Sequence, residues 1–278
     1  MLKFFRSIRK KLIEQDNLRK YLLYAIGEIL LVVIGILIAV QINSWNQDRV
    51  NRSKEFEYLK GIHSDLNRQI ESLNRTIEIN ERSISIVHGL LEEYIRLDGF
   101  ERNDSIFSRI NTINRSASPT GIKTTFSELM YGAEIPLIRD ERLRNEIVLF
   151  YQELDAMIGR SRNNSEVIFQ SQLHPIFTNR TIVDLEQFNN VAFDFNLNLH
   201  PLSNPYSART KELAFKNLED PEMQLEFINA LNMKAIIEGL QRERSKLIIA
   251  SAEQLKSRIE KEVQEEHRNE LNSATFDL

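Results

Sequence analysis

Residues 21–42 read YLLYAIGEILLVVIGILIAVQI, an almost uninterrupted run of apolar residues. Only one of its residues, Glu28, is charged. With a rise of about 1.5 Å per residue, a helix of this length extends roughly 33 Å, enough to cross a hydrocarbon core of about 30 Å. We therefore expect residues 21–43 to form a transmembrane helix that anchors the rest of the chain.

The charged residues on either side of this segment predict its orientation. The first twenty residues carry seven Lys and Arg against two acidic residues, whereas residues 43–62 carry four against three. Because the more basic flank stays in the cytoplasm, residues 1–20 are predicted to be a cytoplasmic tail and residues 44–278 a translocated domain. The alternative is a cleaved signal peptide, which would have a shorter apolar region followed by small residues at the cleavage site. Residues 40–43, VQIN, offer no such site.

The basic tail has a pattern of its own. Phe5, Ile8 and Leu12 recur at helical spacing among basic residues, which is typical of an amphipathic helix on an anionic membrane surface. A disordered basic flank is the alternative. The whole chain has a net charge of −4 and the tail has +5, so the remainder carries −9. An acidic large domain argues against nucleic acid as a partner and leaves the lipid bilayer as the first expected partner.

The composition favours long helices. The chain has no cysteine, so a domain outside the cytoplasm would lack disulfides and would depend on its apolar core. Nine glycines and six prolines are few for 278 residues, which favours helices over a sandwich or barrel. We therefore predict a mainly α fold. One N-terminal transmembrane helix is followed by a long-helix periplasmic bundle or coiled-coil-like domain with a small irregular or β insertion.

A seven-residue repeat follows the span and runs to about residue 97. One position of the repeat holds Leu59, Leu66, Leu73, Asn80, Val87 and Tyr94. The position four residues later holds His63, Ile70, Ile77, Ile84 and Leu91. This pattern is typical of a two-stranded parallel coiled coil in which Asn80 sets the register. The same stripe can instead pack in a bundle with later helices of the chain, which also need partners. In either case, the residues predicted to set the helix register are Leu66, Ile70, Leu73, Ile77, Asn80 and Ile84.

Three further helices are predicted in the middle of the chain. Residues 104–113 favour a short helix. The pattern Thr125–Glu128 indicates a capping box that opens a second helix, which ends near Gly132. Asp140 can cap a third and longer helix, which His174–Pro175 is predicted to end.

The last third of the chain combines an irregular segment with one more long helix. Residues 178–207 are irregular, and within them residues 191–199 alternate between apolar and polar, which suggests an isolated strand. Pro221 is a favourable first-turn residue for a helix that continues to about His267.

Glu28 is the residue of the span that most needs an explanation, because a carboxylate inside a bilayer is costly. On one helical face it lies near Tyr24 and Gly35, and Gly35 with Ala39 forms a small-xxx-small pair suited to close helix packing. Three interpretations are open. Glu28 with Tyr24 contacts another membrane subunit, Glu28 carries protons, or it reaches the headgroups and only assists self-association.

The sequence offers no catalytic constellation. The five histidines do not cluster, and no zinc-protease, nucleophile-elbow, P-loop or dinucleotide-binding motif is present. Asp194, Asn196 and Asn198 imitate the start of a calcium loop, but Leu199 replaces the required glycine and Pro205 the bidentate glutamate. We therefore predict no catalytic, metal-binding or cofactor-binding residue, no cofactor, and no enzymatic activity.

Several segments resemble a family of single-pass membrane proteins of Bacteroidota that carry an uncharacterised domain. The resemblance is carried by Lys3–Arg6, by KYLLYAIGEI at 20–29, by VVIGILIA at 32–39, by QINSWN at 41–46 and, less closely, by Glu128–Gly132 and Leu137–Arg144. The resemblance implies a Gram-negative inner membrane with the N-terminus in the cytoplasm and the C-terminal domain in the periplasm. It implies no activity and no catalytic residue.

Three hypotheses for function follow. The first is a membrane-anchored, non-enzymatic periplasmic protein that acts as an oligomerising scaffold or as a partner-binding subunit of an envelope complex. The second is a stator-like subunit of an ion-driven membrane complex that uses Glu28. The third is a periplasmic helical-bundle ligand sensor. All three place self-association or contact with other membrane proteins among the expected interactions.

Overall fold

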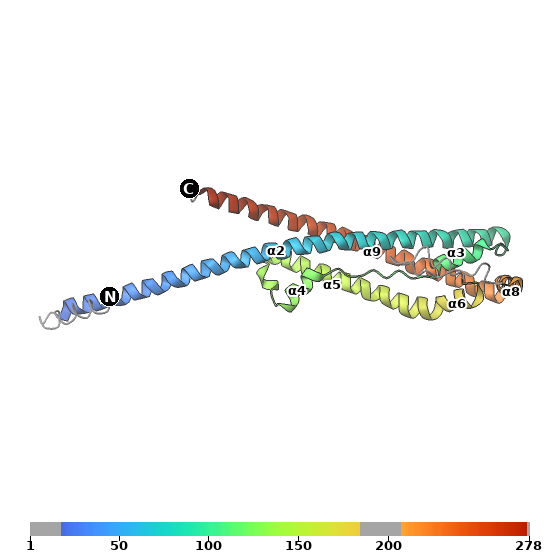
Figure 1. The fold of residues 1–278 in the computed structure, drawn as a ribbon, viewed down its shortest axis with the longest axis horizontal. Helices are drawn as coiled ribbons and strands as arrows, with labels where there is room; N and C mark the ends of the chain where they lie inside the picture. Colours follow the sequence, from blue (N-terminus) through green and yellow to red (C-terminus); the bar gives the residue numbers. More distant parts are fainter. Residues whose placement is uncertain (1–17, 184–206, 277–278) are drawn as a thin grey trace. The chain divides into compact units, whose positions relative to one another are not determined.

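A computed structural model describes residues 18–183 and 207–276 (Figure 1). These residues are mainly helical, and none of them lies in a β-strand. The mainly α prediction is confirmed for this described part, whereas the strand predicted at residues 191–199 lies outside it. The chain divides into two compact units, residues 1–57 and residues 58–278.

The longest helix, α2, runs without interruption over Leu18–Leu97. It contains both the predicted span and the whole heptad region, because no proline interrupts its eighty residues. The helix ends where Asp98 adopts a left-handed backbone with φ of 53°. The amide of Gly99 then donates to the carbonyl oxygen of Tyr94 at 3.1 Å, which satisfies a carbonyl of the last turn.

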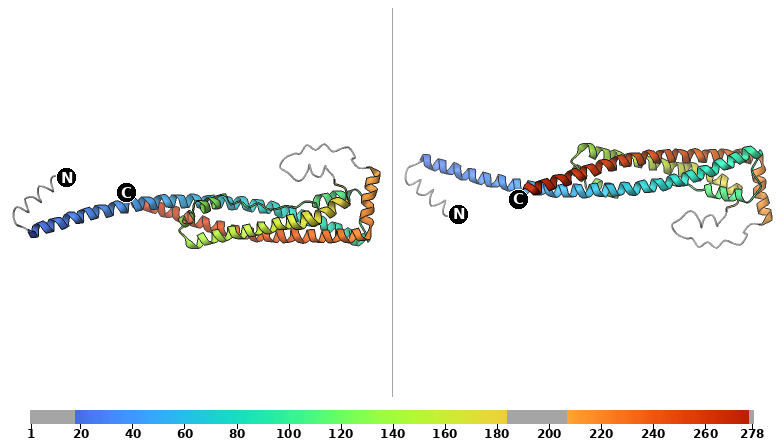
Figure 2. Two further views of the ribbon diagram at one scale, coloured as in Figure 1. Left: turned by 90° about the horizontal axis from the view of Figure 1, so that it is seen from below. Right: turned by 90° about the horizontal axis from the view of Figure 1, so that it is seen from above.

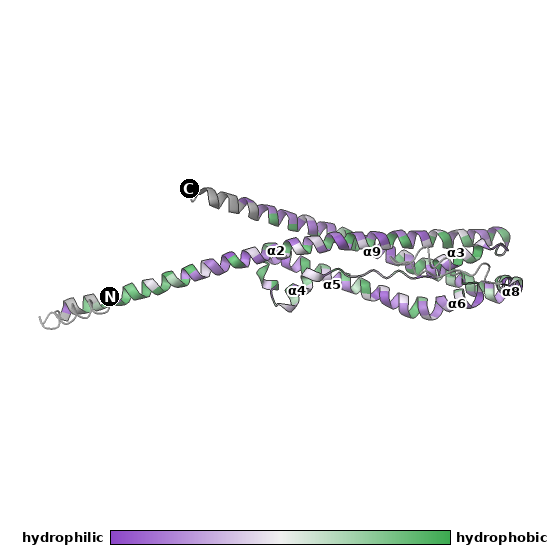
Figure 3. Ribbon diagram, in the orientation of Figure 1, coloured by the Kyte–Doolittle hydropathy of each residue, from purple (hydrophilic) through white to green (hydrophobic). Residues whose placement is uncertain are grey.

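The part of α2 in the first unit carries a continuous apolar run (Figure 3). Its most apolar window has a mean hydropathy of 2.6, and none of that window is buried. The side chains of residues 29–50 are all exposed. An apolar, exposed helix of this length meets the requirements of length and composition for crossing a membrane.

The second unit is built on three long helical elements that lie side by side (Figure 2). They are α2 from residue 58 onward, α5 with its continuation, and α9. Shorter helices complete the unit. The elements after α2 are α3 (Ser105–Ile113), α4 (Thr124–Tyr131), the 3₁₀ turn η1 (Ile135–Leu137), α5 (Glu141–Asn163), the π-helix η2 (Asn164–Leu173), α6 (His174–Arg180), α8 (Ala208–Glu219) and α9 (Pro221–Phe276).

Helices α2 and α9 run antiparallel within the second unit. Near one end of the pair, the hydroxyl of Tyr94 donates to Oε1 of Gln224 at 3.2 Å. Near the other end, Nε2 of His63 lies 2.8 Å from Oε1 of Glu260. Residue numbers therefore rise along α2 as they fall along α9, so the stripe predicted on α2 packs within its own chain, as the bundle interpretation requires.

Two apolar clusters form the core of this unit. The first cluster joins α2 residues 59–73, α5 residues 143–157 and α9 residues 248–259, together with Leu129 of α4 and Ile138. The second cluster joins α2 residues 87–90, η2 and α6 residues 169–177 and α9 residues 227–237, together with α3 and α8. The three long elements therefore contribute to both clusters.

Two capping hydrogen-bond patterns were predicted for helices in the middle of the chain, and the structure contains one of them. Asp140 caps α5 as predicted, because its side chain accepts hydrogen bonds from the amides of Arg142 and Leu143. The predicted capping box at Thr125–Glu128 is wrong. The amide of Thr125 instead donates to Oδ2 of Asp65 at 2.8 Å, so a residue of α2 supplies the cap of α4.

Two more boundaries differ from the prediction. His174–Pro175 does not end the helical path, because Pro175 lies in the first turn of α6, where no amide hydrogen is needed. Helix α8, which was not predicted, begins after Ser207, whose hydroxyl accepts from the amide of Thr210 at 3.2 Å. The other predicted helices are confirmed: α3, α4 with Gly132 as its C-cap, and α9 beginning at Pro221.

Candidate functional site

The first candidate site is the polar and small-residue face of the span. Glu28 is half-buried, and Gly35 and Ala39 are exposed on the same helix. A Cβ added at Gly35 would meet nothing within 4 Å, so this face is open to the close approach of another helix. The backbone of Tyr24 lies in α2 one turn before Glu28, whereas its side chain lies outside the described part of the structure.

The second candidate site is the face of α2 that the heptad pattern singled out. Leu66, Leu73 and Asn80 are fully buried there. Their predicted role in setting the helix register is not tested by their burial and stays a prediction.

The second position of the repeat is less buried than the first. Ile70, Ile77 and Ile84 are only half-buried. The buried residues are those one position earlier: Ile62, Gln69, Thr76, Ser83 and Leu90. Apolar spacing alone does not find this position, because three of its five residues, Gln69, Thr76 and Ser83, are polar.

The partner of Gln69 is an extended segment, residues 114–123, which we call the strap. Figure 1 shows it as a thin line between α3 and α4. Nε2 of Gln69 donates to the carbonyl oxygen of Thr120 at 3.2 Å, and the amide of Ile122 donates to Oε1 of Gln69 at 2.7 Å. One amide side chain thereby satisfies both a donor and an acceptor of the strap backbone.

Helix α9 binds the other half of the strap. Nε2 of Gln241 donates to the carbonyl oxygen of Ala117 at 2.7 Å, and Nζ of Lys234 donates to the carbonyl oxygen of Arg115. These side chains bond backbone atoms, so they hold the strap without reading its sequence. The apolar pattern of α9 does not reveal Lys234 and Gln241, because a buried glutamine or lysine looks in a sequence like a break in the apolar stripe.

Lys234 also forms a buried ion pair with Glu238. Nζ of Lys234 lies 2.7 Å from Oε1 of Glu238, and the two side chains are 2% and 5% exposed. The ammonium group lies 4.3 Å from the centroid of the Phe169 ring, which adds a cation–π contact. Burial lowers the pKa of Lys234 and raises the pKa of Glu238, and the attraction between the two charges opposes both shifts.

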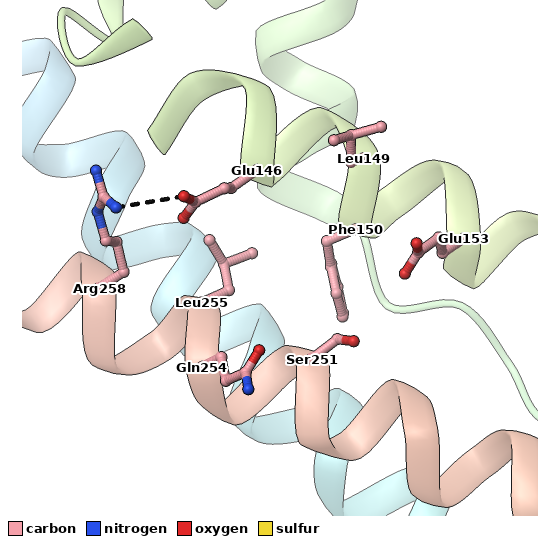
Figure 4. A pocket seen from close by; sticks show the side chains of 8 residues that line it. All are labelled: Glu146, Leu149, Phe150, Glu153, Ser251, Gln254, Leu255 and Arg258. Atoms are coloured by element: carbon pink, nitrogen blue, oxygen red, sulfur yellow. Dashed lines mark hydrogen bonds and ion pairs between the residues drawn. The ribbon is translucent and has the colours of Figure 1, made fainter. Parts of the chain in front are cut away.

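The third candidate site is an open groove between α5 and α9 (Figure 4). Its volume is about 300 Å³. Phe150 and Leu255 give it an apolar floor, and an ion pair of 3.3 Å between Glu146 and Arg258 crosses it. The remaining lining residues are Leu149, Glu153, Ser251 and Gln254. The groove is open, and its two carboxylates, Glu146 and Glu153, both come from α5.

The fourth candidate site is a row of apolar residues on the outer side of α9, which we call the α9 row. It consists of Met233, Ile236, Leu240 and Leu247, which are between 42% and 68% exposed. Their spacing of three, four and seven residues places them on one face of the helix. The sequence alone does not reveal this row, because the exposed and the buried apolar residues of one helix look alike in a sequence.

Groups of side chains that could bind a metal ion were considered for the described residues only. Residues 18–183 and 207–276 contain no group of three or more His, Cys, Asp or Glu side chains placed to hold a metal ion.

These features define a class of protein. Its members have a mainly helical domain that follows one helix long and apolar enough to cross a membrane. Residues 28–154 match the model of a family of unknown function, DUF6090. The matched region begins at Glu28 and contains Gly35, Ala39, the buried face of α2 and the strap. It does not contain α9, which carries the α9 row and the Lys234–Glu238 pair. No curated protein and no solved structure matches the chain.

Proposed function

We propose that the protein is a membrane-anchored, non-enzymatic scaffold of the bacterial envelope that associates with itself or with other membrane proteins. In this proposal the N-terminus lies in the cytoplasm, the apolar part of α2 spans the inner membrane, and the second unit lies in the periplasm. The charge asymmetry around the span supports this orientation. The origin in Bacteroidota stays a prediction.

The α9 row is the observation that carries the scaffold proposal. Scattered exposed apolar residues are ordinary, but four at helical spacing on one face make a strip that another helix can cover. The buried stripe of α2 is already occupied by the chain's own helices. Association therefore uses the outer side of α9, and the open face at Gly35 and Ala39 adds a second contact within the bilayer.

Purification of the full-length protein in mild detergent tests this proposal. We expect the protein to run above its monomer mass or to retain a membrane partner at a fixed ratio. Replacing Leu247, which is 68% exposed, by aspartate places a charge in the α9 row and should lower the fraction of associated protein while the helix content stays unchanged. The control is Asn232→Asp, because Asn232 is exposed on the same helix. A wild-type protein that is monomeric and retains no partner would contradict the proposal.

A stator-like subunit of an ion-driven complex is a second candidate, favoured by a single acidic residue within an apolar span. Glu28→Gln keeps the size and removes the proton-binding carboxylate. The stator proposal expects this variant to be made and assembled at the normal level but to fail in complementing a deletion strain. Full complementation by Glu28→Gln would exclude it.

A ligand sensor is a third candidate, favoured by the groove between α5 and α9. The expected result is a rise in the melting temperature of the full-length protein in detergent with one class of small molecule. Phe150→Ala and Leu149→Asp change the floor and the rim of the groove and should abolish that rise. No shift across a broad panel of metabolites would argue against a sensor.

A further inference from the structure

The apolar core of the second unit is interrupted at a single level. The first and second clusters each take residues from all three long elements. The segments that lie between the clusters are therefore neighbours as well: residues 74–86 of α2, residues 158–168 of α5 and η2, and residues 238–247 of α9. An ion pair of 4.0 Å between Lys246 and Glu81 joins two of these segments directly. We call this level of the bundle the joint.

The buried residues of the joint are polar. Within the three segments the buried positions hold Thr76, Asn80, Ser83, Ser161, Glu238, Gln241 and Ser245. Leucines and isoleucines at the equivalent positions on either side interlock across the bundle. Small polar side chains do not interlock in this way, and each can exchange one hydrogen-bond partner for another.

Several of these polar groups lack a partner in the observed arrangement. Asn80 is fully buried, and neither its amide nitrogen nor its amide oxygen is hydrogen-bonded. The hydroxyl of Ser245, also fully buried, has no partner either. A buried polar group without a partner loses its hydrogen bonds to water and gains none in exchange, which costs free energy. Other arrangements of the helices, in which water or protein groups bond these side chains, therefore compete with the observed one.

The third long element changes its geometry at the same level. Helix α5 ends at Asn163, and the next ten residues, Asn164–Leu173, form a π-helix. The π-helix is rare and is mostly limited to a single turn. The π-helix begins within the joint and continues into the second cluster, where Phe169 and Leu173 are buried. The α-helical geometry of the third element therefore ends at the joint, and this observation does not depend on the polar residues of α2 and α9.

We propose that the joint is a hinge between two halves of the helical body, and that α2 and α9 exchange hydrogen-bond partners there as the hinge moves. The half around the first cluster and the half around the second cluster move as rigid bodies, because each has its own interlocked core. The strap limits the movement, since Thr120 is bonded to Gln69 in one half and Arg115 to Lys234 in the other. This hinge goes beyond the scaffold proposal, because it requires neither a partner nor a second copy.

Hydrogen exchange of the full-length protein in detergent gives the first test. The amides of residues 74–86 and 238–247 are expected to exchange at least tenfold faster than those of residues 59–73 and 248–259. Asn80→Leu replaces the unpartnered amide with a side chain that can interlock, and it should slow exchange in the joint and raise the melting temperature. Ser85→Ala is the control, because Ser85 is exposed in the same segment of α2.

Distance measurements between spin labels give the second test and separate a hinge from local fraying. The chain has no native cysteine, so labels can be placed at single introduced cysteines. The pair Glu153→Cys and Asn232→Cys joins exposed positions in the two halves, whereas Glu153→Cys and Gln254→Cys joins exposed positions within one half. A hinge predicts a broad or two-peaked distribution of label-to-label distances for the first pair only. Asn80→Leu should narrow that distribution.

Two results would overturn the hinge: equally narrow distributions for both label pairs, or joint amides that exchange as slowly as those of the two clusters. If Asn80→Leu does not fold, Ser245→Ala removes one unpartnered hydroxyl with little change in volume. Slower exchange in Ser245→Ala supports the hinge, and unchanged or faster exchange counts against it.

Discussion

Lys234 and Glu238 show how much one buried pair of charges matters in this fold. Both side chains are almost fully enclosed, and Lys234 additionally bonds the strap and faces the Phe169 ring. The attraction between the charges offsets the cost of removing them from water only while both are present. Removing one partner leaves the other charged and buried.

The first prediction concerns this pair. Lys234→Met should reduce the free energy of unfolding by about 3–5 kcal/mol, because Glu238 is then left without its cation. The double variant Lys234→Met with Glu238→Leu should recover most of that loss. Denaturant unfolding of the full-length protein in detergent measures both values. A single variant within about 1 kcal/mol of wild type would show that the pair is not buried as described.

The second prediction concerns Asp140, the cap of α5. Its pKa lies below the ordinary value chiefly because the amide of Leu143 donates to the carboxylate, with further help from Arg258 and the amide of Arg142. A carboxylate with a lowered folded-state pKa stabilises the protein above the unfolded-state pKa of about 4, and that contribution is lost as the pH falls through the folded-state value. Asp140→Ala should cost about 1 kcal/mol at pH 7.

The pH dependence separates the cap from other effects of this substitution. The difference between wild type and Asp140→Ala should shrink as the pH falls below about 4, because the wild-type carboxylate then becomes protonated. Asp140→Asn keeps a capping oxygen but has no charge, so it should lose less stability at pH 7 and lack this dependence. Melting temperatures between pH 2 and pH 7 measure the effect, and parallel curves for all three proteins would contradict it.

At the scale of elements, the strap depends on side chains rather than on a neighbouring strand. Gln69→Leu removes both hydrogen bonds that Gln69 makes with the strap and should cost roughly 2 kcal/mol, at about 1 kcal/mol per bond. The strap should then open more often, and trypsin should cut after Arg115 faster than in wild type. Asn74→Leu, at an exposed position of the same helix, is the control. Equal cleavage rates for Gln69→Leu and wild type would contradict the role of Gln69.

The repeat of α2 shows how far the sequence could predict these elements. Leu59, Leu66 and Leu73 are buried where a period of seven places them, because burial of apolar residues follows helical spacing. Gln69 could not be found in this way, since its hydrogen bonds go to Thr120 and Ile122, which lie more than fifty residues further along the chain. Asp65 shows the same limit, because it caps α4 from sixty residues away. Local pattern therefore predicted most helices, whereas the polar contacts between helices required the structure.

At the scale of the whole molecule, the topology of the chain in the membrane decides which side the second unit faces. The exposed apolar run in α2 has the length and composition of a membrane span, and the basic residues before it favour an N-terminus in the cytoplasm. The scaffold proposal requires the second unit, with its candidate sites, to lie in the periplasm. The α9 row, the strap and the joint all belong to this unit.

Cysteine labelling in spheroplasts tests whether the second unit lies in the periplasm. Ser118 is exposed in the strap, and the chain has no native cysteine, so Ser118→Cys provides a single reporter thiol, with Ser7→Cys as the reporter for the tail. In intact spheroplasts, a membrane-impermeant maleimide should label Ser118→Cys fully and Ser7→Cys only after lysis. Protection of Ser118→Cys until lysis would contradict the account.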